Sequence, residues 1–271
     1  MISRWITRSL MGMALLAMTA TVSFAQPHKE AYNKALEAQK AKNYTEAYTN
    51  YAEAKAGAEA AGDADITGKC TRIMAKLDKL FGSQAYKQGN YQKAIDHFNT
   101  GISLDPSYTA NHYNKGLAQK KMGDEAGALA SFKIAMEGKD AKVTRAAENA
   151  VRSSFHSKAS SLVAKANASS TDAAAAIAEL EAMQEYVDAD ADTHFYMATA
   201  HSLAGNHSAA VAAADAALAI HKKGKSDKAK IYYVKAEALL AIGNTEAAKA
   251  SFAEAVYGQY RTSAQHYLDT L

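Results

Sequence analysis

The sequence predicts an all-α protein, a solenoid in which short helix-turn-helix units are stacked one after another along the chain. Three observations predict this fold. Alanine supplies much of the 48% of residues that are hydrophobic, and the 271 residues include only two prolines, Pro27 and Pro106. Alanine loses no side-chain entropy in a helix, whereas proline interrupts the helical hydrogen bonds. The third observation is a set of residues that returns at a fixed interval.

The interval is 34 residues, and four residue types return at it. The members of the first set are Gly82, Gly89, Ala94 and Phe98, and those of the second are Gly116, Gly123, Ala128 and Phe132. A fixed interval of this length is typical of repeat proteins, in which each unit packs only on its neighbours.

Glycine followed by Asn or Asp marks the turn between the two helices of a unit. Glycine tolerates the left-handed backbone that ends a helix, and Asn or Asp can cap the next one. The turns are Gly89-Asn90, Gly123-Asp124, Gly205-Asn206 and Gly243-Asn244.

A small residue lies seven positions before each turn, two helical turns back, and lets the second helix approach closely. These residues are Gly82, Gly116, Ala198 and Ala236. An Ala with an aromatic residue four positions later follows the turns, and the aromatic ring is expected to fill the wedge between units. The pairs are Ala94 with Phe98, Ala128 with Phe132, Ala248 with Phe252 and, as a variant, Ala47 with Tyr51.

This pattern resembles the tetratricopeptide repeat (TPR) family, whose units are two antiparallel helices. The resemblance implies a right-handed α-solenoid of about five to six units with a C-terminal capping helix. We place units at 28–61, 75–108, 109–142, 191–224 and 229–262. Coiled coil is the competing fold, and the glycine turns argue against it because no heptad persists.

The remaining segments depart from the 34-residue interval. An extra segment at 62–74 is expected to lengthen helices, and the Lys-rich stretch 221–230 adds four residues. Residues 143–190 form a degenerate unit with a long helix at 143–166, a turn at 167–171 and a second helix at 172–186. A capping helix is expected at 262–271, because the last unit must cover its apolar edge.

The first 25 residues are predicted to be a cleaved signal peptide. Arg4 and Arg8 precede a short uncharged apolar run, and Ser23-Phe24-Ala25 is a small-x-small cleavage pattern. The run is too short to predict a membrane-spanning helix. We therefore expect a periplasmic or secreted protein with N-terminal units at 26–142, the degenerate unit at 143–190, and C-terminal units with the cap at 191–271.

The charge balance argues against nucleic acid as the partner. Lys and Arg number 31 against 28 Asp and Glu. Arg4 and Arg8 belong to the predicted signal peptide, so 29 bases face 28 acids in the rest of the chain. A nucleic-acid-binding protein usually carries a pronounced basic field.

The sequence contains no motif that predicts catalysis or a cofactor. The signatures of hydrolases, nucleotide-binding loops and zinc proteases are absent. Cys70 is the single cysteine and lies among apolar residues at helical spacing, which favours a buried thiol over a reactive one. We expect a protein that is not an enzyme and has no cofactor, and the alternative is a non-standard active site in 143–190.

Two groups of residues raise the alternative of a metal-binding or small-ligand-binding protein. Asp188, Asp190 and Asp192 copy the start of a calcium loop, but the glycine and glutamate that the loop requires are missing. The simpler interpretation is a solvated loop whose acidic side chains stabilise the N-terminus of the next helix. His194 and His201 share one helical face and could bind zinc, although their positions match helix-packing positions of the family.

In the family, one side of each first helix lines a concave groove, and helical geometry places unit positions 2, 5, 9, 12 and 13 on it. Position 5 is aromatic in four units, and lysines gather in the N-terminal half. The candidate partner-binding residues are Tyr32, Lys76, Lys79, Tyr86, Lys87, Tyr113, Lys120, Lys121, Phe195 and Tyr233.

Aromatic anchors beside cations suit an extended acidic or carboxylate-ended peptide. Residues 26–142 carry 17 bases and 14 acids, whereas 143–271 carry 12 and 14. The equally weighted alternative is that the lysines are ordinary solvated residues. For the lysine run between 222 and 230, a flexible linker is favoured over contact with an anionic surface. The sequence thus predicts an envelope scaffold that binds a protein or peptide in its groove.

Overall fold

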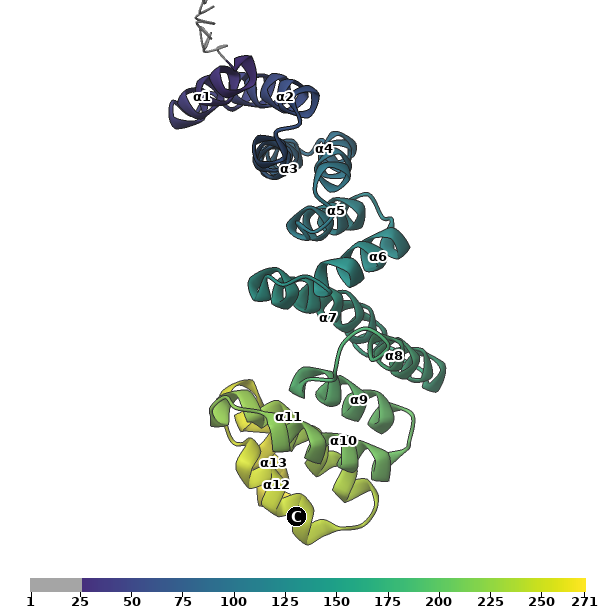
Figure 1. The fold of residues 1–271 in the computed structure, drawn as a ribbon. Coiled ribbons are helices and arrows are strands. Elements are labelled where there is room, and N and C mark those ends of the chain that lie inside the picture. Colours follow the sequence, from purple (N-terminus) through teal and green to yellow (C-terminus); the bar gives the residue numbers. More distant parts are fainter. Residues whose placement is uncertain (1–25) are drawn as a thin grey trace, which may run out of the picture. The chain divides into compact units, whose positions relative to one another are not determined.

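A computed structural model describes residues 26–271, and this part of the chain is helical without strands (Figure 1). The predicted all-α fold is confirmed, and the predicted signal peptide lies outside the described residues. The elements are α1 (Pro27–Lys40), α2 (Tyr44–Ala61), α3 (Ala64–Lys87), α4 (Tyr91–Leu104), α5 (Ala110–Lys121), α6 (Glu125–Met136), α7 (Ala141–Val163), α8 (Ser170–Met183), α9 (Ala191–Leu203), α10 (His207–Ile220), α11 (Lys225–Ala241), α12 (Thr245–Ala255), the 3-10 helix η1 (Gly258–Tyr260) and α13 (Arg261–Thr270).

The chain divides into two compact units, Met1–Cys70 and Thr71–Leu271, and the boundary falls inside α3. In the described part of the first unit, α1 packs along α2. The hydroxyl of the buried Tyr51 donates to Gln39 Oε1 at 2.7 Å. Burial raises the pKa of Tyr51 to about 12, so the phenol stays protonated and remains a donor.

In the second unit, each helix from α4 to α13 packs on the next one in the chain. The predicted arrangement of antiparallel pairs is therefore present as α5–α6, α9–α10 and α11–α12. The degenerate unit also forms a pair, α7–α8, and its two helices lie close to the ranges expected from the sequence. The stack is an α-solenoid of helical repeats.

The small residue of each pair allows the close approach that the sequence predicts. A Cβ atom at Gly82 would lie 2.4 Å from the Phe98 ring, and one at Gly116 would lie 2.7 Å from the Phe132 ring. Both phenylalanines are fully buried. Because real atoms do not approach this closely, only glycine fits against the ring at these two positions.

The turns between paired helices use the left-handed backbone, as predicted. Gly89, Gly123, Gly205 and Gly243 have φ between 77° and 82°. The predicted caps are confirmed in part: Asp124 and Asn244 accept a backbone N–H of the next helix, whereas the side chains of the two other cap residues, Asn90 and Asn206, form no such bond.

Apolar clusters join neighbouring pairs. One cluster contains Phe132 of α6 with Val151 and Phe155 of α7, so the ring fills a wedge between successive pairs. The predicted capping helix is α13, and its Tyr267 stacks on Phe252 of α12 with ring centroids 4.3 Å apart. The cap covers the apolar edge of the last pair, as a terminal element of a solenoid should.

Of two irregular segments, one is more helical than expected and the other is as expected. The Lys-rich stretch was expected to be a flexible linker, which is wrong for most of its length: α11 begins at Lys225, and only residues 221–224 connect it to α10. The extra segment at 62–74 lengthens a helix, as predicted, because α3 begins at Ala64. None of the helices described has the length and apolarity that crossing a membrane requires.

Candidate functional site

One face of the second unit is shared by alternate helices. α5 contacts α7, α7 contacts α9, and α9 contacts α11, in addition to the contacts within each pair. The first helices of successive pairs therefore lie side by side. This is the arrangement from which the sequence analysis derived a common binding face, and we call the surface formed by these helices the first-helix face.

Polar side chains connect the helices of this face. Lys120 Nζ of α5 donates to Ser154 Oγ of α7 at 2.7 Å. The next step joins α7 to α9, where His156 Nε2 lies 2.8 Å from Thr193 Oγ1. The last step joins α9 to α11 through Asp192 Oδ1 and Lys230 Nζ, 2.6 Å apart. These contacts hold the helices in register.

The aromatic residues predicted at position 5 are half-buried and use part of each ring for packing. In the second unit, Tyr113 lies 6.0 Å from Phe132 and Tyr233 lies 5.7 Å from Phe252, measured between ring centroids. Phe195 carries the ammonium of Lys230 4.4 Å above its ring. Only the remaining ring surface is free for a partner.

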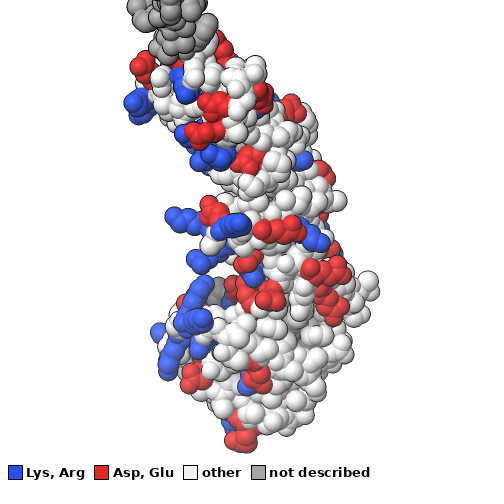
Figure 2. Space-filling model, in the orientation of Figure 1, with Lys and Arg blue, Asp and Glu red and all other residues white. Residues whose placement is uncertain are grey.

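The predicted residues are not one cluster. Tyr32 belongs to the first unit and packs edge-on against Tyr51 at 5.7 Å. In the second unit the lysines at 76, 87, 120 and 121 are exposed, whereas Lys79 and Tyr86 are half-buried. Tyr86 packs on Tyr91 at 5.4 Å. Figure 2 shows basic side chains on the surface of the second unit, and their contact with a partner stays a prediction.

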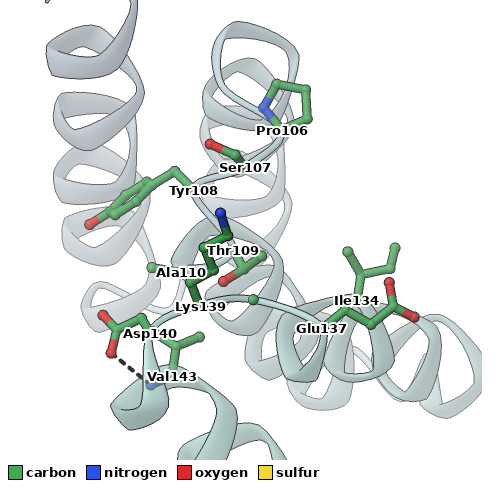
Figure 3. A pocket seen from close by; sticks show the side chains of 11 residues that line it. Pro106, Ser107, Tyr108, Thr109, Ala110, Ile134, Glu137, Lys139, Asp140 and Val143 are labelled. Carbon is green, nitrogen blue, oxygen red and sulfur yellow. Dashed lines mark hydrogen bonds between the residues drawn. The ribbon is translucent and has the colours of Figure 1, made fainter.

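A hollow of about 530 Å³ lies where the α4–α5 and α6–α7 connections meet (Figure 3). Its lining mixes apolar residues such as Ile134 and Val143 with polar ones such as Tyr108 and Asp140. Asp140 caps α7 by accepting the backbone N–H of Lys142 at 2.9 Å. The hollow is built from connections between pairs and contains none of the predicted partner-binding residues.

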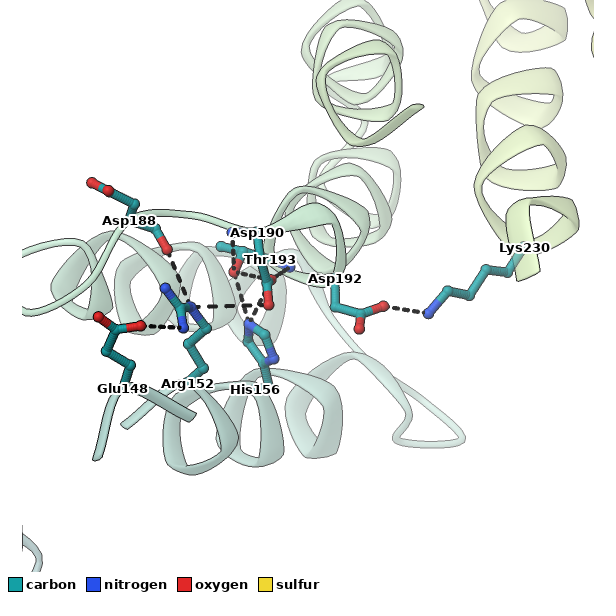
Figure 4. Close-up of polar contacts among 8 residues, drawn as sticks. All are labelled: Glu148, Arg152, His156, Asp188, Asp190, Asp192, Thr193 and Lys230. Atoms are coloured by element: carbon teal, nitrogen blue, oxygen red, sulfur yellow. Dashed lines mark hydrogen bonds and ion pairs between the residues drawn. The ribbon is translucent and has the colours of Figure 1, made fainter. Parts of the chain in front are cut away.

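A polar cluster that the sequence analysis did not predict lies between α7 and the start of α9 (Figure 4). Arg152 donates to the backbone oxygen of Asp188 at 3.3 Å and lies 4.0 Å from Asp190 Oδ2. Asp190 Oδ1 lies 3.7 Å from His156 Nε2 and accepts the Thr193 backbone N–H at 2.8 Å. The acidic residues of this loop therefore stabilise the N-terminus of α9, as expected if the loop is solvated and binds no calcium.

The protonation of this cluster follows from burial and charge. Burial lowers the pKa of His156, although Asp190 and Asp192 oppose the shift. The imidazole is therefore neutral at pH 7. Burial raises the pKa of Asp192. The hydrogen bond and the positive charge of Lys230 lower it by more than this, so the pKa of Asp192 lies below its ordinary value.

Next to this cluster, an open hollow of about 390 Å³ lies on α7. Its lining is polar except for one aromatic ring, and consists of Asn149, Arg152, Ser153, His156, Ser157, Ser160, Asp190 and Tyr196.

One signal in the sequence could have found this surface. Aligning Ala159 and Ala166-Asn167 with the small residue and turn of the other units puts Ser153, His156 and Ser160 at positions 2, 5 and 9. These are the positions that helical geometry assigns to the first-helix face. The degenerate unit therefore contributes to the same face as its neighbours.

The described residues contain no group of three or more His, Cys, Asp or Glu side chains placed to hold a metal ion. Asp188, whose side chain is exposed, and the half-buried His194 and His201 accordingly form no such group. Cys70 is buried, and burial raises the pKa of its thiol to about 11. This agrees with the interpretation of Cys70 as a packing residue.

Comparison with protein families agrees with this geometry. A family model described as TPR repeat matches residues 82–123, and a second, described as tetratricopeptide repeat, matches 229–257. This chain contains tetratricopeptide repeats. The first match covers the end of α3, α4 and α5, and the second covers most of α11 together with α12.

Several solved structures have similar folds. A TPR protein of Thermus thermophilus, TTC0263, is 20% identical, with a TM-score of 0.32 over 72% of this chain and 98% of that one. The MamA protein is 16% identical, with a TM-score of 0.41 over 72% of this chain and 95% of that one. PilW, a type IV pilus biogenesis factor, is 15% identical, with a TM-score of 0.35 over 89% of this chain and 99% of that one. Comparison with curated proteins gives no match. The TPR repeats support a protein–protein interaction scaffold.

Proposed function

We propose that this TPR protein is an exported scaffold of the bacterial envelope that binds a protein or an extended, acidic peptide along its first-helix face. The observation that carries the proposal is the succession of contacts from α5 to α7, α9 and α11. A solenoid whose first helices lie side by side offers an extended surface, which suits a chain-like ligand better than a small molecule.

Exposed lysines support an acidic ligand. Lys120 and Lys121 lie on α5 of the first-helix face, and Lys76 and Lys87 lie on α3, which precedes it in the chain. Half-buried rings such as Tyr113 and Phe195 lie on the same set of helices and can pack on a peptide's side chains. Charge complementarity of this kind steers association and sets specificity.

The groove can be tested with a matched pair of triple variants in a chain that starts at Gln26. The first combines Lys79→Glu, Lys120→Glu and Lys121→Glu. The control combines Lys93→Glu, Lys133→Glu and Lys249→Glu, which make the same charge change on the second helices α4, α6 and α12. We expect the first variant to lose about tenfold or more in affinity for a captured envelope partner or a Glu-rich peptide.

The control should bind as the unaltered chain does, and circular dichroism should show equal helix content in all three proteins. Equal losses in both variants would attribute binding to net charge and contradict the groove. Export is tested separately by cell fractionation and N-terminal sequencing, which should find a chain that begins at Gln26 in the periplasm or medium. A cytosolic chain that retains residues 1–25 would contradict export.

A further inference from the structure

The C-terminal half of the chain has an uneven charge distribution. Residues 222–230 carry five lysines and one aspartate. The rest of 143–271 carries seven basic and thirteen acidic residues, which is a net charge of −6. These nine residues therefore carry a net charge of +4, whereas the remainder of this half is acidic. In Figure 2, Lys and Arg form a dense group over the α10–α11 junction, at the lower left of the view.

Three of these lysines form no ion pair with a described residue. They are the exposed Lys222 and Lys223 and the half-buried Lys228, although the charge of Lys223 helps to lower the pKa of Asp192. Lys225 lies 4.0 Å from Glu254 and 5.7 Å from the centroid of the Tyr257 ring. Only Lys230 has a close partner, Asp192 at 2.6 Å. We call Lys222, Lys223, Lys225 and Lys228 the junction lysines.

Intramolecular stability does not explain the junction lysines. They lie in the four-residue connection and in the first turn of α11, where the helix dipole disfavours cations. Ile220, two residues before Lys222, leaves 45% of its surface exposed. An exposed aliphatic side chain next to exposed lysines suits a surface that docks on lipid, where both kinds of side chain find favourable contacts.

We infer that the α10–α11 junction docks the protein on an anionic phospholipid surface. Each lysine near such a surface gains attraction to its negative potential, and a protruding apolar side chain can enter the interface between head groups and acyl chains. The acidic remainder of residues 143–271 is repelled by the same surface, so the charge separation orients the molecule with the junction toward the lipid. This docking does not depend on a ligand at the first-helix face.

The test is co-sedimentation of the chain from Gln26 onward, which lacks the apolar segment before it, with phospholipid vesicles. We expect binding when about a third of the phosphatidylcholine is replaced by phosphatidylglycerol, and none to phosphatidylcholine alone. Raising salt from about 0.05 M to about 0.5 M should release the protein, because surface charges are then screened over a few ångströms.

Two sets of variants locate the contact. Lys222→Gln, Lys223→Gln and Lys228→Gln together should weaken binding about tenfold or more, whereas Lys93→Gln, Lys133→Gln and Lys249→Gln, with the same charge change, should leave it within about twofold. Ile220→Ser should weaken binding severalfold without changing charge. Circular dichroism checks that each variant keeps its helix content.

Three results would overturn the inference. The first is equal binding to both kinds of vesicle or to neither. The second is an equal loss in the control triple variant, which would show that net charge and not the junction is responsible. The third is tight binding of soluble polyglutamate by the junction lysines without vesicle binding, which would assign them to an acidic polypeptide. The first two results do not bear on peptide binding at the first-helix face.

Discussion

The pairs α5–α6 and α7–α8 achieve the same packing with different residues. In the regular pair, the backbone of Gly116 lies against the ring of Phe132. In the degenerate pair, Ala159 and Leu180 are both fully buried in one cluster. The first helix thus has alanine where the regular pair has glycine, and the second has leucine where the regular pair has phenylalanine. The unit therefore requires side chains of complementary volume, and the glycine–phenylalanine pair is one way to supply them.

The two pairs differ in what else they carry. The 23-residue α7 is longer than the 12-residue α5. The first half of α7 packs on Phe132 of the preceding pair, and its second half packs on α8 and α9. α7 also carries Arg152 and His156, which contact Asp188 and Thr193 at the start of the next pair. The degenerate unit therefore combines this packing with a polar surface.

The largest expected effect comes from truncating the large side chain of each pair. We expect Phe132→Ala to lower the free energy of unfolding by about 4 kcal/mol and Leu180→Ala by about 3 kcal/mol, because each leaves a cavity at a fully buried site. Urea denaturation followed by circular dichroism measures both. A loss below about 1 kcal/mol for Leu180→Ala would show that the degenerate pair collapses around the cavity.

The small residue is tested by adding one methyl group. Gly116→Ala should destabilise the fold by about 2 kcal/mol, because its Cβ would lie 2.7 Å from Phe132 and 3.1 Å from a backbone oxygen. The matched control is Gly224→Ala, since no atom lies within 4 Å of a Cβ there. Because Gly224 is the N-cap of α11, where alanine is less favourable than glycine, the control should cost about 1 kcal/mol or less. Equal effects would contradict the close-approach explanation.

A smaller effect is expected at the cap that follows the degenerate pair. Asp190 accepts from Thr193 N and Thr193 Oγ1 donates to Asp190 Oδ1, both at 2.8 Å, so Asp190→Ala should cost about 1 kcal/mol. The exposed Asp188 contributes its backbone oxygen to Arg152, and Asp188→Ala should therefore cost less than about 0.5 kcal/mol. Hydrogen exchange at the start of α9 measures the difference, and equal exchange in the two variants would exclude the cap.

The smallest expected effect is a difference in pKa between two histidines, one on α5 and one on α7. Burial lowers the pKa of both His112 and His156, and only His156 has Asp190 and Asp192 opposing the shift. NMR titration of the imidazole C–H signals should place both values below the ordinary one of about 6.5. Asp190→Asn should lower the pKa of His156 further and leave that of His112 unchanged. A rise for His156 would contradict the assigned role of Asp190.

The same shifts set the sign of a pH dependence. Below about pH 6.5 the unfolded chain takes up protons at these histidines before the folded chain does. Stability is therefore fully present above that pH and falls as the pH decreases through the folded pKa values. Replacing both histidines with Gln should flatten this part of the stability profile in urea titrations at pH 5 to pH 7.5, and an unchanged slope would assign the dependence to other groups.

The sequence by itself determined the repeat. The interval between Gly82 and Gly116, the Gly-Asn and Gly-Asp turns, and the alternation of small and large residues depend on contacts within one unit, and such contacts leave a local pattern. The same reasoning located the pair at 143–190 and the capping helix, because alanine-rich, proline-poor segments between turns have few alternatives to a helix.

Only the tertiary structure decided which side chains of successive units meet. The contacts Lys120–Ser154, His156–Thr193 and Lys230–Asp192 join residues 34 to 38 positions apart. Their partners are set by how the helices stack, and polar pairs at this separation leave no periodic signal. The start of α11 at Lys225 was also decided by the stack. The lysines by themselves suggest a linker, but the burial of Ala229 and Ile231 against neighbouring helices stabilises a helix that includes Lys225 and Lys228.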